Sequence, residues 1–195
     1  NLWIKNGDSI EKNASSPFLQ DLDSLPFPNR EIWFEWMGKS TDSRFSILLG
    51  RGCPYLCTYC ANHALRQITD GKYVRFRSPG NIVEEIQYLQ EKYPENRDYF
   101  FEVETFNVKL DWIYELCDKL EALNNSLDEP LVFGTNYRVG AKSDYDNMFA
   151  AFNRANIRDL TVGLESGSER VRKEILKRYY SNEDMITMVK AARKH

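Results

Sequence analysis

The chain has 195 residues, which is long enough for one domain with a hydrophobic core. Its formal net charge of −3 argues against a broad electrostatic attraction to nucleic acid or to an anionic membrane surface. No apolar run reaches the length of a membrane span, no signal-peptide pattern is present, and the cysteine content is too low for a disulfide scaffold. We therefore predict a protein of the reducing cytoplasm that does not cross a membrane, and the charge disfavours nucleic acid as its partner.

Residues 1–44 are predicted to form a linker or a packed N-terminal arm with little regular structure. Asn6-Gly7-Asp8 marks a turn, and prolines interrupt the segment that follows it. Residues 22–28 are apolar enough to pack on a surface but contain too much proline for a helix. Residues 33–37 hold an aromatic cluster of Trp33, Phe34 and Trp36 with Met37, which we interpret as a cap over the bottom of a barrel or as an interface.

Beyond residue 44 the chain alternates between strand and helix patterns. We predict strands at residues 45–50, 99–104, 131–136 and 159–165. Helices are predicted at 61–68, from Ser78-Pro79, at 110–120, at 144–153, after a capping-box pattern at 166–169, and from Ser181. This alternation indicates an α/β fold with a parallel sheet and right-handed crossovers. A sheet of four such units leaves an open apolar edge, so we expect its partner strands to lie beyond His195.

Three of the four cysteines, Cys53, Cys57 and Cys60, fall within eight residues with the spacing C-x3-C-x2-C. Three thiolates on one loop can hold three corners of a cubane iron–sulfur cluster and leave the fourth iron open, whereas clusters that only carry electrons usually have four cysteine ligands. The alternatives are a zinc site that His63 completes as a Cys3His set, or buried structural thiols. The loop follows the predicted strand at 45–50, and active sites of α/β barrels gather at that end of the strands.

Residues 50–63, which read GRGCPYLCTYCANH, resemble the cluster loop of the cobalamin-binding branch of the radical S-adenosylmethionine (radical SAM) superfamily. Two other stretches are similar to the same branch. Residues 22–28 are similar to the connector that follows its N-terminal cobalamin-binding domain, and residues 163–170 with 176–181 are similar to its fourth βα unit. The resemblance implies a partial (β/α)6 TIM-like barrel of the radical SAM type.

The same resemblance implies a division of the chain into two parts. Residues 1–44 would be the linker or arm from a cobalamin-binding domain that this sequence does not contain, and residues 45–195 a radical SAM core domain that lacks the family's last two units. The chain begins with Asn1 and ends at His195 directly after a helical pattern, so we expect a domain excised from a longer polypeptide.

Residue roles follow from the resemblance at the cysteine loop. Cys53, Cys57 and Cys60 would ligate a [4Fe–4S] cluster. Tyr59 would lie against the adenine of S-adenosylmethionine (SAM), with plain packing as its alternative role. His63 would orient the loop rather than bind metal.

The resemblance also assigns charged residues to SAM. Glu104 would bind its amine, although the family often has paired aspartates there and this chain has Val103-Glu104. Glu165 would accept hydrogen bonds from the ribose hydroxyls, and Arg178 would pair with the carboxylate, with Lys177 as the competing candidate. Arg138, at the end of the third predicted strand, would face either the cofactor cavity or the surface.

The activity that the resemblance implies is reductive cleavage of SAM to methionine and a 5′-deoxyadenosyl radical that abstracts hydrogen from an unidentified substrate. The electron would come from a reductant of the flavodoxin or ferredoxin type. Cobalamin-dependent methylation or a ring rearrangement would belong to the parent protein, because this sequence contains no cobalamin-binding motif. Two alternatives stay open: a methylthiotransferase-like enzyme acting on RNA or a ribosomal protein, and a non-enzymatic Cys3His zinc module.

Overall fold

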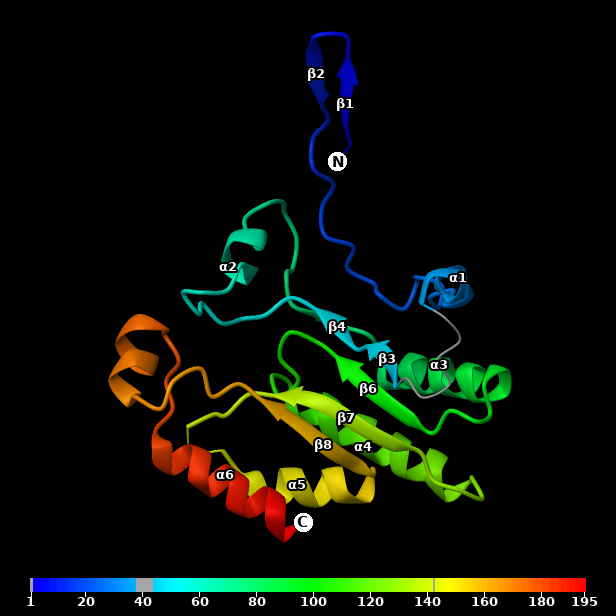
Figure 1. The fold of residues 1–195 in the computed structure, drawn as a ribbon, viewed down its shortest axis with the longest axis vertical. Coiled ribbons are helices and arrows are strands. Elements are labelled where there is room, and N and C mark those ends of the chain that lie inside the picture. The colour runs from blue at the N-terminus through cyan, green and yellow to red at the C-terminus, as the bar shows by residue number, and fades with distance from the viewer. Residues whose placement is uncertain (1, 38–43, 142) are drawn as a thin grey trace.

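The computed structural model describes residues 2–37, 44–141 and 143–195. Its centre is a four-stranded sheet with the strand order β3-β6-β7-β8, in which every neighbouring pair is parallel (Figure 1). The strands are β3 (Phe45–Leu48), β6 (Asp98–Glu102), β7 (Val132–Tyr137) and β8 (Ile157–Val162). The predicted α/β fold with a parallel sheet is therefore confirmed.

One face of the sheet is covered by a row of helices. They are α3 (Pro79–Lys92), α4 (Leu110–Asn125), α5 (Tyr145–Arg154) and α6 (Asn182–Lys194), and each packs on the next (Figure 1). Alternate strand residues point into this layer: Phe101 and Phe133 are fully buried and stack with ring centroids 5.1 Å apart. Cys117 is buried in the same core on α4, so it packs with the helices and is separate from the three cysteines of the loop.

Three helices begin where the sequence predicts. Ser78 caps α3 by accepting a hydrogen bond from the Asn81 backbone N–H at 3.1 Å. Asp144 caps α5 in the same way, and Ser181 forms a capping box with Asp184 at the start of α6.

The capping box predicted at residues 166–169 is wrong. Ser168, not Ser166, caps this turn, which is a short π-helix, η2 (Val171–Ile175), instead of a regular α-helix. The Glu169 carboxylate does not accept a hydrogen bond from the Ser166 backbone N–H, as the predicted capping box requires. It accepts one from the Asn182 backbone N–H instead, at 2.6 Å. Contact with the start of α6 therefore replaces the local capping interaction.

Three strands end earlier than predicted. β3 ends at Leu48, two residues before the predicted end at Gly50. β6 ends at Glu102, where its neighbour β3 ends, because Leu48 is the last residue paired with it. β8 ends at Val162, opposite the last residue of β7. Glu104 and Glu165 consequently lie in loops beyond the carboxyl ends of their strands.

The N-terminal segment has more regular structure than predicted. A hairpin of β1 (Trp3–Asn6) and β2 (Ser9–Lys12) projects away from the rest of the chain, with the predicted turn at its tip (Figure 1). A 3-10 turn, η1 (Glu31–Trp33), and a short helix, α1 (Phe34–Met37), follow. The hairpin escapes prediction because every residue of both strands is exposed, so no buried face marks them.

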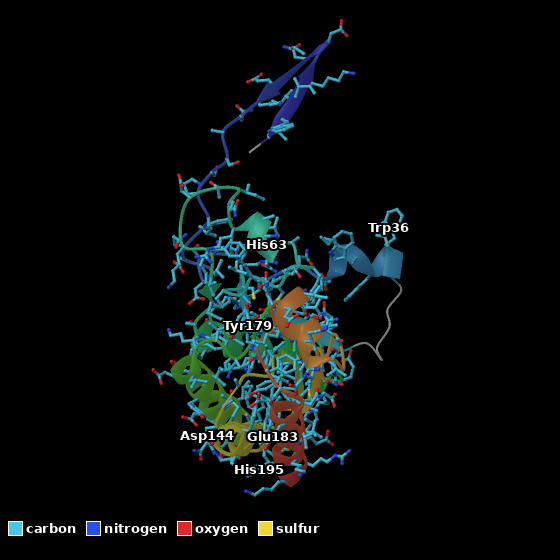
Figure 2. All side chains as sticks on the ribbon, turned by 90° about the vertical axis from the view of Figure 1, so that its left-hand side faces the viewer. Trp36, His63, Asp144, Tyr179, Glu183 and His195 are labelled. Carbon is cyan, nitrogen blue, oxygen red and sulfur yellow. The ribbon has the colours of Figure 1, made fainter. Side chains whose placement is uncertain are left out.

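The aromatic cluster at residues 33–37 is divided. Phe34 packs against Tyr93 at the amino-terminal side of the sheet, with ring centroids 6.0 Å apart. Trp33 and Trp36 are 57% and 80% exposed, and Figure 2 shows Trp36 pointing away from the barrel. The Met37 side chain, and residues 38–43 of the predicted arm, lie outside the described part of the chain.

The stretch between the hairpin and η1 is fastened to the barrel. Arg30 donates a hydrogen bond to Glu85 of α3 at 2.8 Å and another to the Ser46 carbonyl at 2.8 Å. Asp23 accepts from the backbone N–H of Ser78 at 2.9 Å. Leu22, in the apolar run at residues 22–28, is buried.

A small antiparallel pair closes the loop that carries the cysteines. β4 (Gly50–Arg51) pairs with β5 (Arg75–Phe76), so the two ends of the segment at 52–74 are held together. Within it, the helix predicted at 61–68 is confined to the single turn α2 (Asn62–Leu65). In the parts of the chain that the structure describes, no helix combines the length and hydrophobicity required to cross a membrane.

Candidate cofactor-binding site

The cysteine loop leaves the carboxyl end of β3 through Gly52. This residue has φ +88°, a left-handed conformation that glycine adopts without strain. A Cβ at Gly52 would also collide with the backbone carbonyl of Tyr73, which lies across the loop. Glycine therefore lets the two ends of the loop approach each other and directs Cys53 over the edge of the sheet.

All three cysteines of the loop have free thiols, and each sulfur has a polar partner. The Cys53 sulfur lies 3.0 Å from the Thr105 hydroxyl. The Cys57 sulfur accepts a hydrogen bond from the Arg138 guanidinium at 3.4 Å, and the Cys60 sulfur accepts one from the Asn62 amide at 3.4 Å. Cys57 is buried, whereas Cys53 and Cys60 are half-buried, so the three cysteines are largely shielded from solvent.

His63 lies on α2, which Figure 2 shows at one end of the barrel, far from Asp144 and His195. Its Nδ1 is buried and makes no hydrogen bond with the described residues. Within the described ranges, no three His, Cys, Asp or Glu side chains converge closely enough to hold one metal ion. A cubane cluster is a larger object, in which each thiolate binds a different iron, so it does not require the three sulfurs to converge on one point.

A second group of predicted residues forms around Arg178. Its guanidinium donates to the Tyr59 hydroxyl at 2.8 Å, to Glu165 at 2.9 Å and to the Gly163 carbonyl at 3.1 Å. Burial acts to lower the pKa of Arg178, but its hydrogen bond to Tyr59 and the neighbouring oxygens outweigh burial and leave the pKa raised. Arg178 is therefore a permanent buried cation, and burial raises the pKa of Tyr59, which stays a neutral phenol.

The backbone around Glu165 is shaped for this contact. Glu165 has φ +61°, which is rare for a residue with a side chain and typical of functional sites. Its carboxylate folds back over Gly163, where any Cβ would collide with it. Lys177, the competing candidate for Arg178, is exposed and makes none of these hydrogen bonds.

The same region is tied to the cysteine loop. Thr58 donates its hydroxyl to the Ile175 carbonyl at 2.7 Å, and its backbone N–H bonds to the Leu176 carbonyl at 3.4 Å. These bonds hold Tyr59 beside Arg178 and place η2 against the loop.

Glu104 and Arg138 follow the carboxyl ends of β6 and β7. Glu104 is exposed, and its carboxylate forms no hydrogen bond or ion pair with the residues that the structure describes. Burial raises the pKa of Tyr73, whose hydroxyl donates a hydrogen bond to the Asn62 side chain. Glu104 directly precedes Thr105, whose hydroxyl lies 3.0 Å from the Cys53 sulfur, so Glu104 is close to the cysteine loop in space.

The structure thus arranges the predicted residues around one loop. Cys53 is next to the strand end that carries Glu104, Cys57 is next to Arg138, and Tyr59 is next to the Arg178–Glu165 pair. The partners that sequence reasoning missed are Thr105, Asn62, Tyr55, Tyr73 and Asn107. Tyr55 and Asn62 lie in the cysteine loop itself, so their nearness to the sulfurs is the one part of this set that the sequence could have indicated.

Two curated proteins are similar to this chain over most of its length. Anaerobic magnesium-protoporphyrin IX monomethyl ester cyclase from Cereibacter sphaeroides is 26% identical over 174 residues, covering 86% of this chain and 26% of the relative. Cytidylyl-2-hydroxyethylphosphonate methyltransferase from Streptomyces wedmorensis is 25% identical over 197 aligned positions, covering 94% of this chain and 35% of the relative. The chain thus spans only about a quarter to a third of the length of these relatives.

Solved structures share the fold. The radical S-adenosylmethionine methyltransferase TsrM from Kitasatospora setae, solved with cobalamin and a [4Fe–4S] cluster, gives a TM-score of 0.63 at 20% identity, over 78% of this chain and 29% of TsrM. The cobalamin-dependent S-adenosylmethionine radical enzyme OxsB gives a TM-score of 0.58 at 18% identity, over 77% of this chain and 22% of OxsB. The four βα units are therefore part of a TIM-like barrel, as predicted.

Residues 47–195 match the Radical SAM superfamily. The match includes all four strands of the parallel sheet from Ile47 onward and the whole cysteine loop. The chain therefore belongs to the Radical SAM superfamily, whose members use a [4Fe–4S] cluster and S-adenosylmethionine.

Proposed function

We propose that this chain is the SAM-cleaving domain of a cobalamin-dependent radical SAM methyltransferase. The observation that carries the proposal is the cysteine loop at the carboxyl end of β3, whose three sulfurs each contact a polar side chain. Methyl transfer is favoured over ring closure because the Streptomyces relative and TsrM are both named methyltransferases. When bound and reduced, the cluster supplies one electron that cleaves SAM to methionine and a 5′-deoxyadenosyl radical.

The residues fit the cluster. Three free thiols on one loop leave the fourth iron of a cubane without a protein ligand, which is the site that SAM requires. Hydrogen bonds to the sulfurs hold their orientation and offset the negative charge that accumulates on the thiolates. Cys53, Cys57 and Cys60 are accordingly the proposed ligands.

The charged residues fit SAM. Glu104 offers a carboxylate that has no described partner, which suits the SAM amine. Arg178 supplies a guanidinium beside Glu165, which suits the SAM carboxylate. Glu165 would accept hydrogen bonds from the ribose with the carboxylate oxygen that Arg178 leaves free, and Tyr59 would lie against the adenine.

Three broader proposals accompany this assignment. Residues 1–44 are the connector from a cobalamin-binding domain of the parent protein, and residues 45–195 are the radical SAM core. Radical SAM enzymes need a reductant, and we assign a flavodoxin or ferredoxin to that role. The four free cysteines support the reducing cytoplasm as the compartment.

Metal content tests the proposal directly. Iron, acid-labile sulfide and zinc are measured on anaerobically reconstituted protein, beside Cys57→Ala and the core variant Cys117→Ala. Equal iron and sulfide, lost in Cys57→Ala and kept in Cys117→Ala, together with 5′-deoxyadenosine formation from SAM and dithionite, is the expected result. Zinc without sulfide would identify a zinc module and overturn the proposal.

A further inference from the structure

Arg138 has an unusual position for a residue expected to contact SAM. Its guanidinium lies on the face of the Tyr55 ring, 3.8 Å from the ring centroid. The same guanidinium donates from Nη1 to the sulfur of Cys57 at 3.4 Å. Tyr55 and Cys57 both belong to the cysteine loop, so Arg138 is stacked on the loop and aimed at one of its sulfurs.

The backbone of Arg138 is fixed from a neighbouring loop. The Asn107 side chain donates to the Arg138 carbonyl at 2.7 Å and accepts from the Arg138 backbone N–H at 3.1 Å. Asn107 follows β6 and Arg138 follows β7, so two successive strand ends hold this residue. With its backbone fixed and its side chain stacked on an aromatic ring, the guanidinium has little freedom to turn away from the sulfur.

The charge of Arg138 has no carboxylate to neutralise it among the described residues, in contrast to Arg178, which pairs with Glu165. Cys57 is the most buried of the three loop cysteines, at 6% exposure, so solvent screens this contact least. A cation beside a buried sulfur stabilises negative charge on that sulfur and on anything bound to it.

We propose that Arg138 is a positioning residue for the iron–sulfur cluster, acting through Cys57, and that it raises the reduction potential of the cluster. This inference rests on the proposed function, because it requires a cluster on Cys57. Reduction adds one negative charge to the cluster, and a nearby cation favours the reduced form. The ring of Tyr55 holds the guanidinium in place, so Tyr55 supports the same effect.

The test is a redox titration of the reconstituted protein without SAM, followed by the electron paramagnetic resonance signal of the reduced cluster. Arg138→Gln is expected to shift the one-electron equilibrium at least tenfold toward the oxidised form, a midpoint about 59 mV lower. Tyr55→Phe keeps the ring and is expected to match the wild type, whereas Tyr55→Leu is expected to shift the midpoint in the direction of Arg138→Gln. Arg158→Gln is the matched control, because Arg158 is exposed near the amino-terminal end of β8 and bonds only to Asn156 and Asn153 among its described neighbours.

The outcomes distinguish a failure of the proposed function from a failure of the role proposed for Arg138. A wild-type protein without iron and sulfide would overturn the proposed function itself. Equal midpoints for the wild type and Arg138→Gln, both with full clusters, would overturn only the role of Arg138, and weaker SAM binding in that variant would reassign the residue to SAM. If Arg138→Gln loses its cluster, the charge effect is tested with Arg138→Lys. A retained cluster with a midpoint near the wild-type value supports the charge effect. Loss of the cluster in both variants overturns it and makes Arg138 a structural support.

Discussion

We predict that Glu85 stabilises the strand end from which the cysteine loop begins. Its carboxylate is 1% exposed and lies between the guanidinium groups of Arg30 and Arg77. Arg77 also donates to the Leu48 carbonyl at 2.9 Å, and its backbone N–H bonds to the Leu49 carbonyl at 2.9 Å. The buried network therefore fixes the end of β3, directly before the cysteine loop begins.

Glu85→Gln keeps the shape of the side chain but leaves two guanidinium groups without their counter-charge. Removing one partner of a buried ion pair costs about 3–5 kcal/mol, and we expect about 3 kcal/mol because the amide oxygen still accepts one hydrogen bond. For a chain of this length that corresponds to a loss of about 6–12 °C in Tm.

The assay is thermal unfolding followed by circular dichroism, with Glu84→Gln as the control. Glu84 is the adjacent residue on the same helix and is exposed, so its substitution is expected to change Tm by less than about 2 °C. Equal Tm values for the two variants would refute the reasoning, because they would mean that the two arginines do not depend on Glu85. A loss of cluster content in Glu85→Gln alone would extend the effect from the network to the loop.

Two further predictions concern the site, and a third concerns the core residue Cys117. Gly52→Ala is expected to prevent cluster assembly, because Gly52 has φ +88° and a Cβ there would collide with the Tyr73 carbonyl. Gly167→Ala is the control: a Cβ at Gly167 meets nothing within 4 Å, so iron and sulfide content should not change. Arg178→Gln is expected to weaken SAM binding at least tenfold, about 1.4 kcal/mol, in equilibrium dialysis, and Lys177→Gln is expected to leave it unchanged; the opposite order would assign the SAM carboxylate to Lys177. Burial raises the pKa of the Cys117 thiol from 9.0 to about 12. The folded protein therefore holds this proton up to higher pH than the unfolded chain, so the stabilisation is complete below about pH 9 and is lost as the pH rises toward 12; iodoacetamide at pH 9 should label Cys117 only after denaturation, which mass spectrometry will show.

The fold could be predicted from the sequence where its signals are local. Amphipathic periods and caps such as Ser78 and Ser181 depend on residues a few positions apart, and they identified α3, α4, α5 and α6. Strand ends were less accurate, because β6 stops where β3 stops, and that limit is set by a distant segment. The exposed hairpin β1–β2 has no buried face and therefore left no pattern to detect.

The candidate site shows the same division. The cysteine spacing lies within eight residues and could be seen directly. The partners of the sulfurs could not: Thr105 is 52 residues from Cys53, and Arg138 is 81 residues from Cys57. Only the crossovers of the parallel sheet bring these strand ends to the loop. The role proposed for Arg138 therefore depends on the tertiary structure, and the sequence alone left it undecided between cavity and surface.

The charges around the loop suggest an order of events for cofactor binding. Glu165 is already neutralised by Arg178, while Arg138 and Glu104 have no ionic partner among the described residues. In the proposed arrangement the cluster brings negative charge to Arg138, and SAM brings a cationic amine to Glu104. Each cofactor would thus satisfy a charge that the protein leaves unpaired, and at Arg138 hydrogen bonds from Asn107 fix the backbone beforehand. Because the Arg178 Nε–H is buried and the terminal nitrogens bond to Tyr59, Glu165 and Gly163, the SAM carboxylate would have to displace one of these partners to reach Arg178. We therefore expect the cluster site to form first, because the iron without a cysteine ligand would itself be part of the SAM site.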